Sequence, residues 1–140
     1  MTALHRLPAA AAAYGAVALG STIGGCARAL VSIALAQPPG AGFPWATLVV
    51  NVTGSFVIGF YATLTEPGGR RFAGAAERRL VMTGICGGYT TFSLFSLETL
   101  QLLQAGRFAA AGLNLGVSLI AWLGAVWLGH ALALRLNRLR

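Results

Sequence analysis

Four apolar segments, each about as long as a bilayer is thick, constrain this chain more than any other feature. They cover residues 9–35, 44–64, 80–104 and 109–134. A helix needs about 20 apolar residues to cross a hydrocarbon core of about 30 Å, and each segment reaches that length. Of the 140 residues, 56% are hydrophobic and only 9% are charged. The sequence therefore predicts an all-α membrane protein with four transmembrane helices in a single transmembrane domain, residues 1–140.

The charged residues indicate how these helices lie in the membrane. The chain has ten arginines, three glutamates, and no lysine or aspartate. Eight arginines flank the apolar segments on the side that holds both termini, whereas the other side has only Arg107. Because arginine is enriched in cytoplasmic loops, we expect cytoplasmic termini and a multi-pass protein of the bacterial cell (inner) membrane. Arginines gathered at helix ends, rather than over a water-soluble surface, argue against a nucleic-acid partner.

Few residues could support catalysis. His5 and His130 lie at opposite ends of the chain, and without aspartate no Ser/His/Asp triad can form. Cys26 and Cys86 both lie inside predicted spans. There they are interpreted as small packing residues rather than as a disulfide or a metal pair. We therefore expect no enzyme activity.

The third apolar segment contains a sequence that weakens a helix at mid-membrane. Gly87 and Gly88 are followed by Tyr89 and then by Thr90 and Thr91. Glycine destabilises a helix, and non-helical backbone at membrane depth is tolerated only where protein or a wet cavity surrounds it. We expect the third helix to be broken mid-membrane, at a place that binds or conducts a solute.

Polar side chains inside the spans gather in the middle and one half of the bilayer. Asn51 lies in the outer half of the second span. Asn114 and Ser118 are four residues apart in the fourth span, hence on one helical face. Thr91 and Ser93 flank the predicted break. One subunit thus offers half of a hydrophilic path, and an antiparallel partner subunit would supply the other half.

Two ionisable residues lie near the outer ends of predicted spans. Arg28 in the first span and Glu98 in the third fall at similar depth. Pairing would reduce the cost that each charge bears in lipid. Alternatively, each side chain reaches the interface separately. The sequence leaves both interpretations open.

The available side chains suit an anion better than a cation. Asparagine amides and serine or threonine hydroxyls donate hydrogen bonds, and there is no ring of carboxylates. Phe92 and Phe95 are three residues apart, beside the predicted break. A phenyl ring has a positive edge, which could replace part of an anion's hydration shell. Spacing alone favours simple core packing for these two rings, so both interpretations stay open at this point.

Three stretches of the chain resemble the CrcB/Fluc family of fluoride channels. These are Gly24-Gly25-Cys26-Ala27-Arg28, residues 45–56 and residues 84–98. The third includes the string Gly87-Gly88-Tyr89-Thr90-Thr91-Phe92-Ser93, which is the most specific of the three. The resemblance extends over nearly the full length of the chain.

The resemblance implies a fluoride-selective anion channel that lowers cytoplasmic fluoride by passive efflux. It implies an antiparallel (dual-topology) homodimer with two pores. A structural sodium ion (Na⁺) at the dimer centre would be held by the backbone carbonyls of Gly87 and Thr90. The fluoride pore would be lined by Asn51, Phe92, Phe95 and Ser118, with Asn114 as a further candidate in the fourth span.

Three features depart from the family pattern. Tyr89 stands where phenylalanine is usual, and Leu94 stands where threonine is usual. The arginine ratio of eight to one is also larger than the weak bias expected of a dual-topology protein. The true insertion topology therefore stays open.

Two other functions fit the hydropathy. A small four-helix proton-coupled multidrug exporter would need a carboxylate inside the membrane, yet the first span has none and Glu98 lies near a helix end. A non-transporting membrane subunit would not explain the weakened third span. Fluoride conduction accounts for more of the sequence than either alternative.

Overall fold

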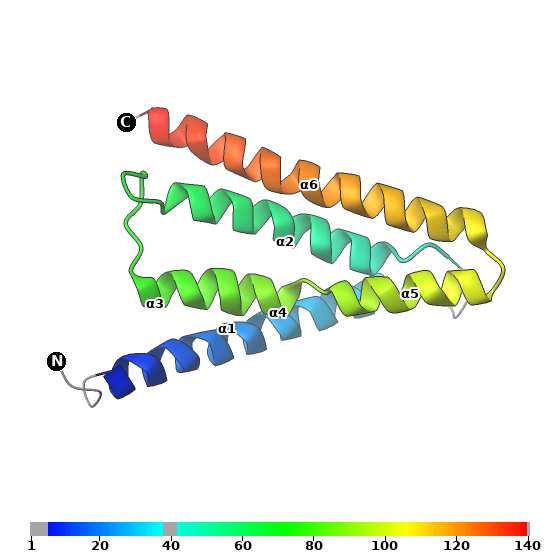
Figure 1. Ribbon diagram of the computed structural model, residues 1–140, viewed down its shortest axis with the longest axis horizontal. Helices are drawn as coiled ribbons and strands as arrows, with labels where there is room; N and C mark the ends of the chain where they lie inside the picture. Colours follow the sequence, from blue (N-terminus) through cyan, green and yellow to red (C-terminus); the bar gives the residue numbers. More distant parts are fainter. Residues whose placement is uncertain (1–5, 38–41, 140) are drawn as a thin grey trace.

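Four long helices form the fold. They run side by side in alternating directions (Figure 1). The structure is a computed structural model that describes residues 6–37 and 42–139. In it the helices long and apolar enough to span a membrane are Ala10–Ala34, Trp45–Leu64, Ala75–Gln104 and Phe108–Arg138. No β-strand occurs in the described ranges. The prediction of an all-helical membrane protein with four spans is confirmed, while His5 and Arg140 lie outside the described residues.

The helical elements follow the predicted segments closely. They are α1 (Arg6–Ala34), α2 (Trp45–Leu64), α3 (Ala75–Arg78), η2 (Arg79–Cys86), α4 (Gly87–Tyr89), α5 (Phe92–Gln104) and α6 (Phe108–Arg138). The third span is thus built from four consecutive pieces, of which η2 is a π-helix. The beginning of α1, the α2–α3 loop and the end of α6 lie at one end of the bundle (Figure 1).

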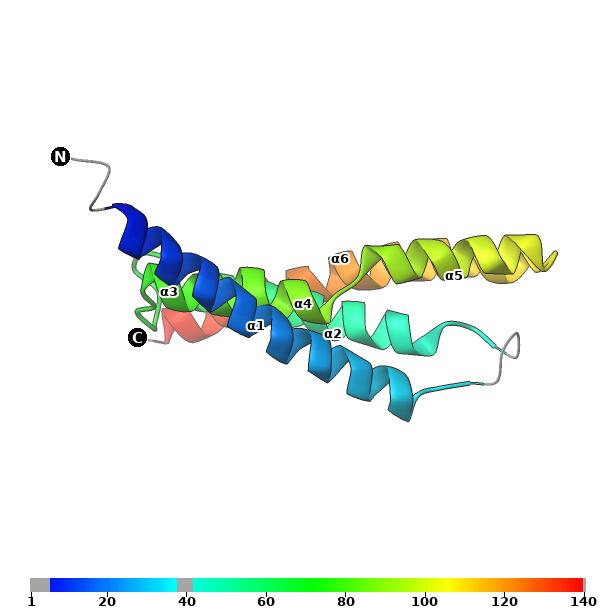
Figure 2. The ribbon, with the colours of Figure 1, turned by 90° about the horizontal axis from the view of Figure 1, so that it is seen from below.

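The helices pack as two pairs. Helix α2 lies along α6, and α1 crosses η2 and α4 (Figure 2). Glycines make both contacts close: a Cβ on Gly24 of α1 would collide with the backbone of Ile85, and one on Gly129 of α6 with the backbone of Phe56. Small residues let helix backbones approach one another, which strengthens packing where lipid removes the hydrophobic driving force.

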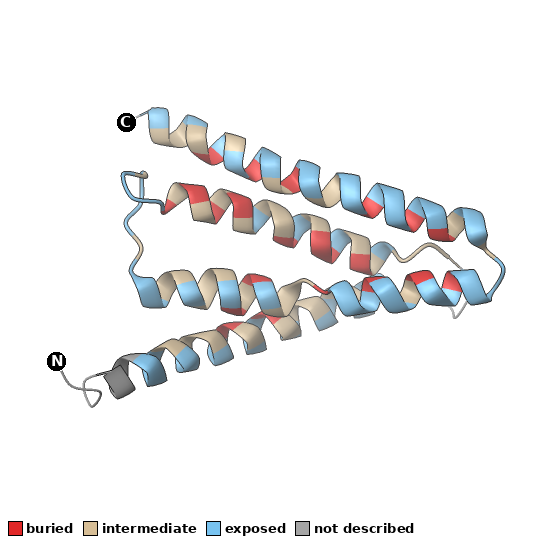
Figure 3. Cartoon of the chain, in the orientation of Figure 1, coloured by how far each residue is buried: buried red, intermediate tan, exposed pale blue. Residues whose placement is uncertain are grey.

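Buried residues form stripes between the helices, whereas the outward faces are largely apolar and exposed (Figure 3). The buried stripe of α6 consists of small or polar side chains: Ala111, Asn114, Ser118, Ala125, Gly129 and Ala133. Large apolar side chains such as Leu30, Ile120 and Trp127 point outward. Small and polar side chains are thus buried between the helices, while large apolar side chains are exposed. Such an exposed apolar surface suits contact with lipid or with a second protein chain.

The third span is interrupted for two residues. Thr90 and Thr91 are extended, with ψ of 157° and 124°, between α4 and α5. Gly87 and Gly88, which we expected to break the helix, are helical instead. The pieces of the span on the two sides of the interruption differ in direction by only 15°. A fully broken third helix is therefore not confirmed; the backbone opens locally, one turn after the glycine pair, while the span keeps its course.

A glycine-terminated turn sends the chain from α5 into α6. Gly106 has a φ of 72°, a backbone conformation that residues with a Cβ seldom adopt. The N–H of Gly106 donates to Leu103 O, and that of Arg107 donates to Leu102 O, at 3.0 and 2.9 Å. This is the Schellman arrangement, which satisfies the last carbonyls of a helix. The turn places α6 antiparallel to α5 at the end of the bundle opposite the two termini (Figure 1).

Candidate functional site

The interruption in the third span is held open by Asn51 of α2. The Asn51 Nδ2 donates to the carbonyl oxygen of Thr91 at 2.8 Å, and the Thr91 N–H donates to Asn51 Oδ1 at 2.7 Å. Both groups are buried. Two reciprocal bonds from one amide satisfy the peptide groups of an extended residue, which a continuous helix would have satisfied itself. Asn51 therefore has a backbone-binding role that sequence reasoning did not predict.

The same arrangement leaves two carbonyls without their usual helical donors. In a continuous helix the N–H of Thr91 would bond to Gly87 O, and that of Leu94 would bond to Thr90 O. Here the first donates to Asn51 and the second to Thr91 Oγ1, at 3.2 Å. The Thr91 hydroxyl also lies 3.2 Å from Ser93 Oγ. The carbonyls of Gly87 and Thr90 are thus among those released by the interruption.

A second polar group, called the outer polar group below, connects α5 with α6 in the half of the bundle away from the two termini. Asn114 Nδ2 donates to Thr99 Oγ1 at 2.8 Å, and the Ser118 hydroxyl lies 3.3 Å from Asn114 Oδ1. Thr99 in turn donates to Phe95 O at 2.7 Å. The predicted placement of Asn114 and Ser118 on one helical face is confirmed, and both are only 1% exposed. Sequence reasoning missed Thr99, although its spacing from Phe95 on α5 could have indicated it.

The two phenylalanines have different surroundings. Phe95 is 3% exposed and packs edge-on with Trp122 of α6, with ring centroids 4.8 Å apart. Phe92 is 66% exposed on the single chain, and its ring centroid lies 5.4 Å from that of Phe95. The rings are neighbours, as the spacing predicts. However, only Phe95 belongs to the core of the chain.

A cavity of about 280 Å³ opens beside the interruption. Its polar lining comes from Asn51, Ser55, Thr90 and Thr91. Its apolar lining comes from α2, η2 and α6, together with Phe92. The lining contains no charged side chain. Such a space suits a solute that neutral hydrogen-bond donors can hold.

The ionisable residues of the spans do not pair. Arg28 Nη1 donates to Thr90 O at 3.5 Å, and Glu98 Oε1 accepts from Thr47 Oγ1 at 2.8 Å. No ion pair joins these two described residues, so the hypothesis of an Arg28–Glu98 pair is wrong for this chain. The sequence indicated similar depth, but the helices direct the two side chains to different partners.

Comparison with known proteins assigns the family. A family model described as CrcB-like protein, Camphor Resistance (CrcB), matches residues 15–130. The chain belongs to the CrcB family. This result agrees with the resemblance seen in the motifs of the first three spans.

Relatives of this CrcB-family chain are named fluoride-specific ion channels. FluC 1 of Rhodopseudomonas palustris (strain BisB18) is 63% identical over 137 residues, which cover 98% of this chain and 97% of that protein. FluC 1 of Bradyrhizobium diazoefficiens is 54% identical over 127 residues, covering 91% and 88%. FluC of Opitutus terrae is also 54% identical over 127 residues, covering 91% and 96%.

The structure brings the predicted site residues of this CrcB-family protein into two neighbouring groups. Asn51, Phe92, Gly87 and Thr90 line the cavity at the interruption. Asn114 and Ser118 belong to the outer polar group. Phe95 lies between the groups, because its carbonyl bonds to Thr99 and its ring contacts Trp122, which also lines the cavity. Trp122 was not predicted, since a tryptophan in an apolar span carries no distinctive sequence signal.

Proposed function

We propose that this protein is a fluoride-selective channel that lowers cytoplasmic fluoride by passive efflux across the bacterial inner membrane. The observation that carries the proposal is the near full-length identity, at 63%, to a protein named as a fluoride-specific ion channel. The structure supports it with a line of neutral donors and no charged group along the cavity. The protein would thus be a channel and not an enzyme.

The donors can replace water around a small anion. Asn51 and Asn114 each keep a second amide hydrogen beyond the one donated to Thr91 O and to Thr99 Oγ1. The Ser118 hydroxyl would turn from Asn114 Oδ1 toward the ion. Phe92 and Phe95 supply ring edges. A site made of neutral dipoles binds an anion strongly enough for entry, yet releases it because no full positive charge holds it. The ion pathway would run along these five residues.

The direction of flow follows from acid–base chemistry and requires no energy source in the protein. Hydrogen fluoride is a weak acid that crosses lipid in its neutral form and dissociates at cytoplasmic pH. The anion is then trapped, because a charge is costly to move through hydrocarbon. A selective pore lets fluoride leave down its electrochemical gradient. The membrane potential, negative inside, assists its exit.

We also propose the antiparallel homodimer. The polar side chains of one subunit occupy the middle and one half of the span, so a second subunit in the opposite orientation would complete the path. Phe92, at 66% exposure, would be covered by that partner. The arginine ratio of eight to one favours a single orientation, whereas an antiparallel dimer requires insertion in both. Mapping the side of the membrane on which both termini lie distinguishes the two.

A sodium ion at the dimer centre fits the backbone chemistry of the interruption. The carbonyls of Gly87 and Thr90 lack their helical donors, and carbonyl oxygens are suitable ligands for a hard cation. A two-fold axis would bring the same two carbonyls from each subunit, four in all. Arg28 also reaches Thr90 O, at 3.5 Å, and would have to share that oxygen. Among the described residues, no cluster of His, Cys, Asp or Glu could hold a metal.

Reconstituted vesicles test the proposed function. Proteoliposomes loaded with fluoride should release it rapidly when a potassium ionophore removes the charge imbalance, and chloride-loaded vesicles should release little. Fluoride flux that vanishes without an imposed proton gradient would indicate an exchanger instead. Proton-coupled uptake of a cationic drug, with no fluoride flux, would favour the multidrug exporter.

A further inference from the structure

Trp122 carries a buried donor that the fold leaves unused. Its indole Nε1 is inaccessible to solvent and has no hydrogen-bond partner among the residues that the structure describes. An indole N–H donates but cannot accept, so an unpaired one needs an acceptor. Leaving a buried polar group unpaired costs about 1–3 kcal/mol. The position therefore calls for an acceptor that is not part of the subunit.

The place of Trp122 on α6 extends the outer polar group inward. Asn114, Ser118 and Trp122 follow one another at intervals of four residues, so they share one face of the helix. With a rise of about 1.5 Å per residue, they span about 12 Å along the axis. Further inward, the buried stripe continues as Ala125 and Gly129, which have no side-chain donors. The side-chain donors of this face therefore end at Trp122, whereas His130 and Asn137, further along α6, bond to Thr63.

Trp122 also connects the two parts of the candidate pathway. It lines the 280 Å³ cavity together with Asn51, Thr91 and Phe92. Its ring packs against Phe95, with the planes at 72° to one another. A cavity of this size holds small solutes or waters. Trp122 thus lies where the outer polar group meets the cavity at the interruption.

We propose that the indole N–H of Trp122 donates a hydrogen bond to the permeating anion, at the inner end of the face formed by Asn114, Ser118 and Trp122. This inference rests on the proposed fluoride conduction. A neutral donor stabilises an anion without the tight retention that an arginine would cause. Because an indole N–H accepts no hydrogen bond, it gives no binding to a cation through that atom, which adds to anion selectivity.

The substitution Trp122→Phe removes the N–H and keeps an aromatic ring beside Phe95. Fluoride efflux from proteoliposomes should fall about tenfold, as expected for the loss of one hydrogen bond to a charged group. Trp127→Phe is the matched control, since Trp127 lies on the same helix but is 67% exposed. It should conduct at the normal rate. If the unaltered protein carries no fluoride, the proposed function fails; if it does and Trp122→Phe equals the control, only this inference fails.

If the variant Trp122→Phe does not fold, the fluorescence of Trp122 itself tests the inference without altering that residue. The chain has three tryptophans, so the double variant W45F/W127F leaves Trp122 as the sole emitter. Sodium fluoride should shift its emission in a saturable way, while sodium chloride should not. An emission that is unchanged by fluoride in a conducting double variant would overturn the inference.

Discussion

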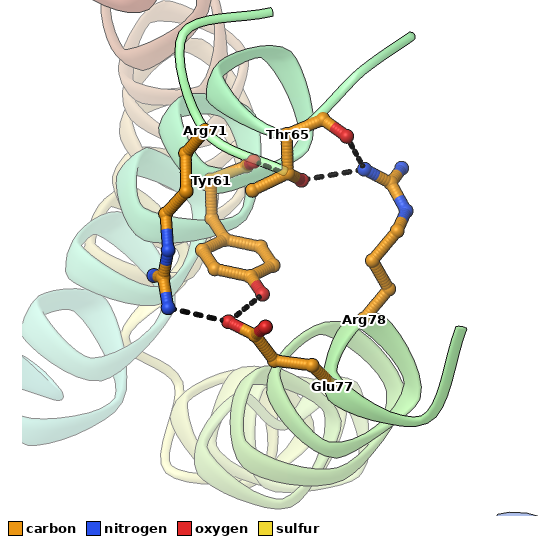
Figure 4. Close-up of polar contacts among 5 residues, drawn as sticks. All are labelled: Tyr61, Thr65, Arg71, Glu77 and Arg78. Carbon is orange, nitrogen blue, oxygen red and sulfur yellow. Dashed lines mark hydrogen bonds and ion pairs between the residues drawn. The ribbon is translucent and has the colours of Figure 1, made fainter. Parts of the chain in front are cut away.

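The charged end of the bundle and the uncharged cavity at the interruption satisfy their polar groups in opposite ways. At the end that holds the α2–α3 loop, Glu77 accepts from Arg71 at 2.6 Å and from the Tyr61 hydroxyl at 2.9 Å (Figure 4). Arg78 donates to the carbonyl and hydroxyl oxygens of Thr65. In the middle, Asn51 satisfies the backbone of Thr91 without any formal charge.

This difference follows from the dielectric environment. Charges at the end of the bundle remain partly solvated, so ion pairs form there at little cost and connect the loop to α3. At membrane depth an unpaired charge would be expensive, and a fixed cation would hold an anion too tightly for transport. Neutral donors in the middle therefore favour the passage of an anion. The charged pairs at the end instead stabilise the α2–α3 loop against α3 and favour one orientation of the helices in the membrane. The following predictions test that division, from the largest effect to the smallest.

Replacing Asn51 with aspartate should abolish conduction. Asn51→Asp exchanges the amide donor for a carboxylate, which repels the anion and also faces the Thr91 carbonyl that Asn51 now binds. We expect fluoride efflux to fall about hundredfold or more, equivalent to about 2.7 kcal/mol on the barrier. The rate of proteoliposome efflux measures this. Thr53→Val, which alters an exposed hydroxyl on the same helix, is the control, and normal flux through Asn51→Asp would contradict an anion path at this residue.

Gly87→Leu should remove sodium binding, whereas Thr90→Val should retain it. The chain has room for a Cβ at Gly87, since no atom outside its own helix backbone and chain neighbours lies within 4 Å. The effect should therefore arise at the proposed dimer interface and in the backbone. Thr90→Val loses only the hydroxyl bond to Cys86 O and keeps the carbonyl. Sodium at a hundredfold excess over its Kd stabilises a protein by about 2.7 kcal/mol, which Gly87→Leu should forfeit.

Thermal unfolding in sodium and in N-methylglucamine buffers measures that stabilisation. The melting temperature of Thr90→Val should depend on sodium as that of the unaltered protein does. Equal melting temperatures in the two buffers for the unaltered protein would exclude a structural sodium ion at the carbonyls.

The two phenylalanine substitutions should separate conduction from packing. Phe92→Ile and Phe95→Ile keep apolar bulk but remove the positive ring edge, so each should lower fluoride flux about tenfold. Phe95→Ile should also reduce stability by about 1 kcal/mol, because it loses the edge-on contact with Trp122. Phe92→Ile should unfold like the unaltered protein. Efflux and denaturant unfolding together check this, and normal flux in both folded variants would show that the rings only pack.

Glu77→Gln should have the smallest effect. It removes the ion pair with Arg71, whose two side chains are 56% and 35% exposed, so the loss of stability should stay below about 1 kcal/mol. Fluoride flux should be unchanged, because Glu77 belongs to the charged end. A marked loss of flux with normal stability would show that this end takes part in conduction.

The sequence by itself determined the local features of this protein, and the tertiary structure determined the contacts between distant residues. The number of spans, their approximate limits and the shared face of Asn114 and Ser118 could be predicted from the sequence, because they depend on local hydropathy and helical periodicity. The weakness of the third span was also visible in its glycines and threonines. These properties need only residues that are close together along the chain.

Only the tertiary structure decided where the third span opens and what holds it. Gly87 and Gly88 stay helical, while Thr90 and Thr91 are extended. Helical propensity alone favours opening at the glycines. However, the buried amide of Asn51 offers both an acceptor and a donor to Thr91, 40 residues away in the chain, and thereby moves the opening one turn further. A contact between distant residues in low dielectric outweighed local propensity. Tertiary packing decided the hydrogen-bond partners of Arg28 and Glu98 for the same reason.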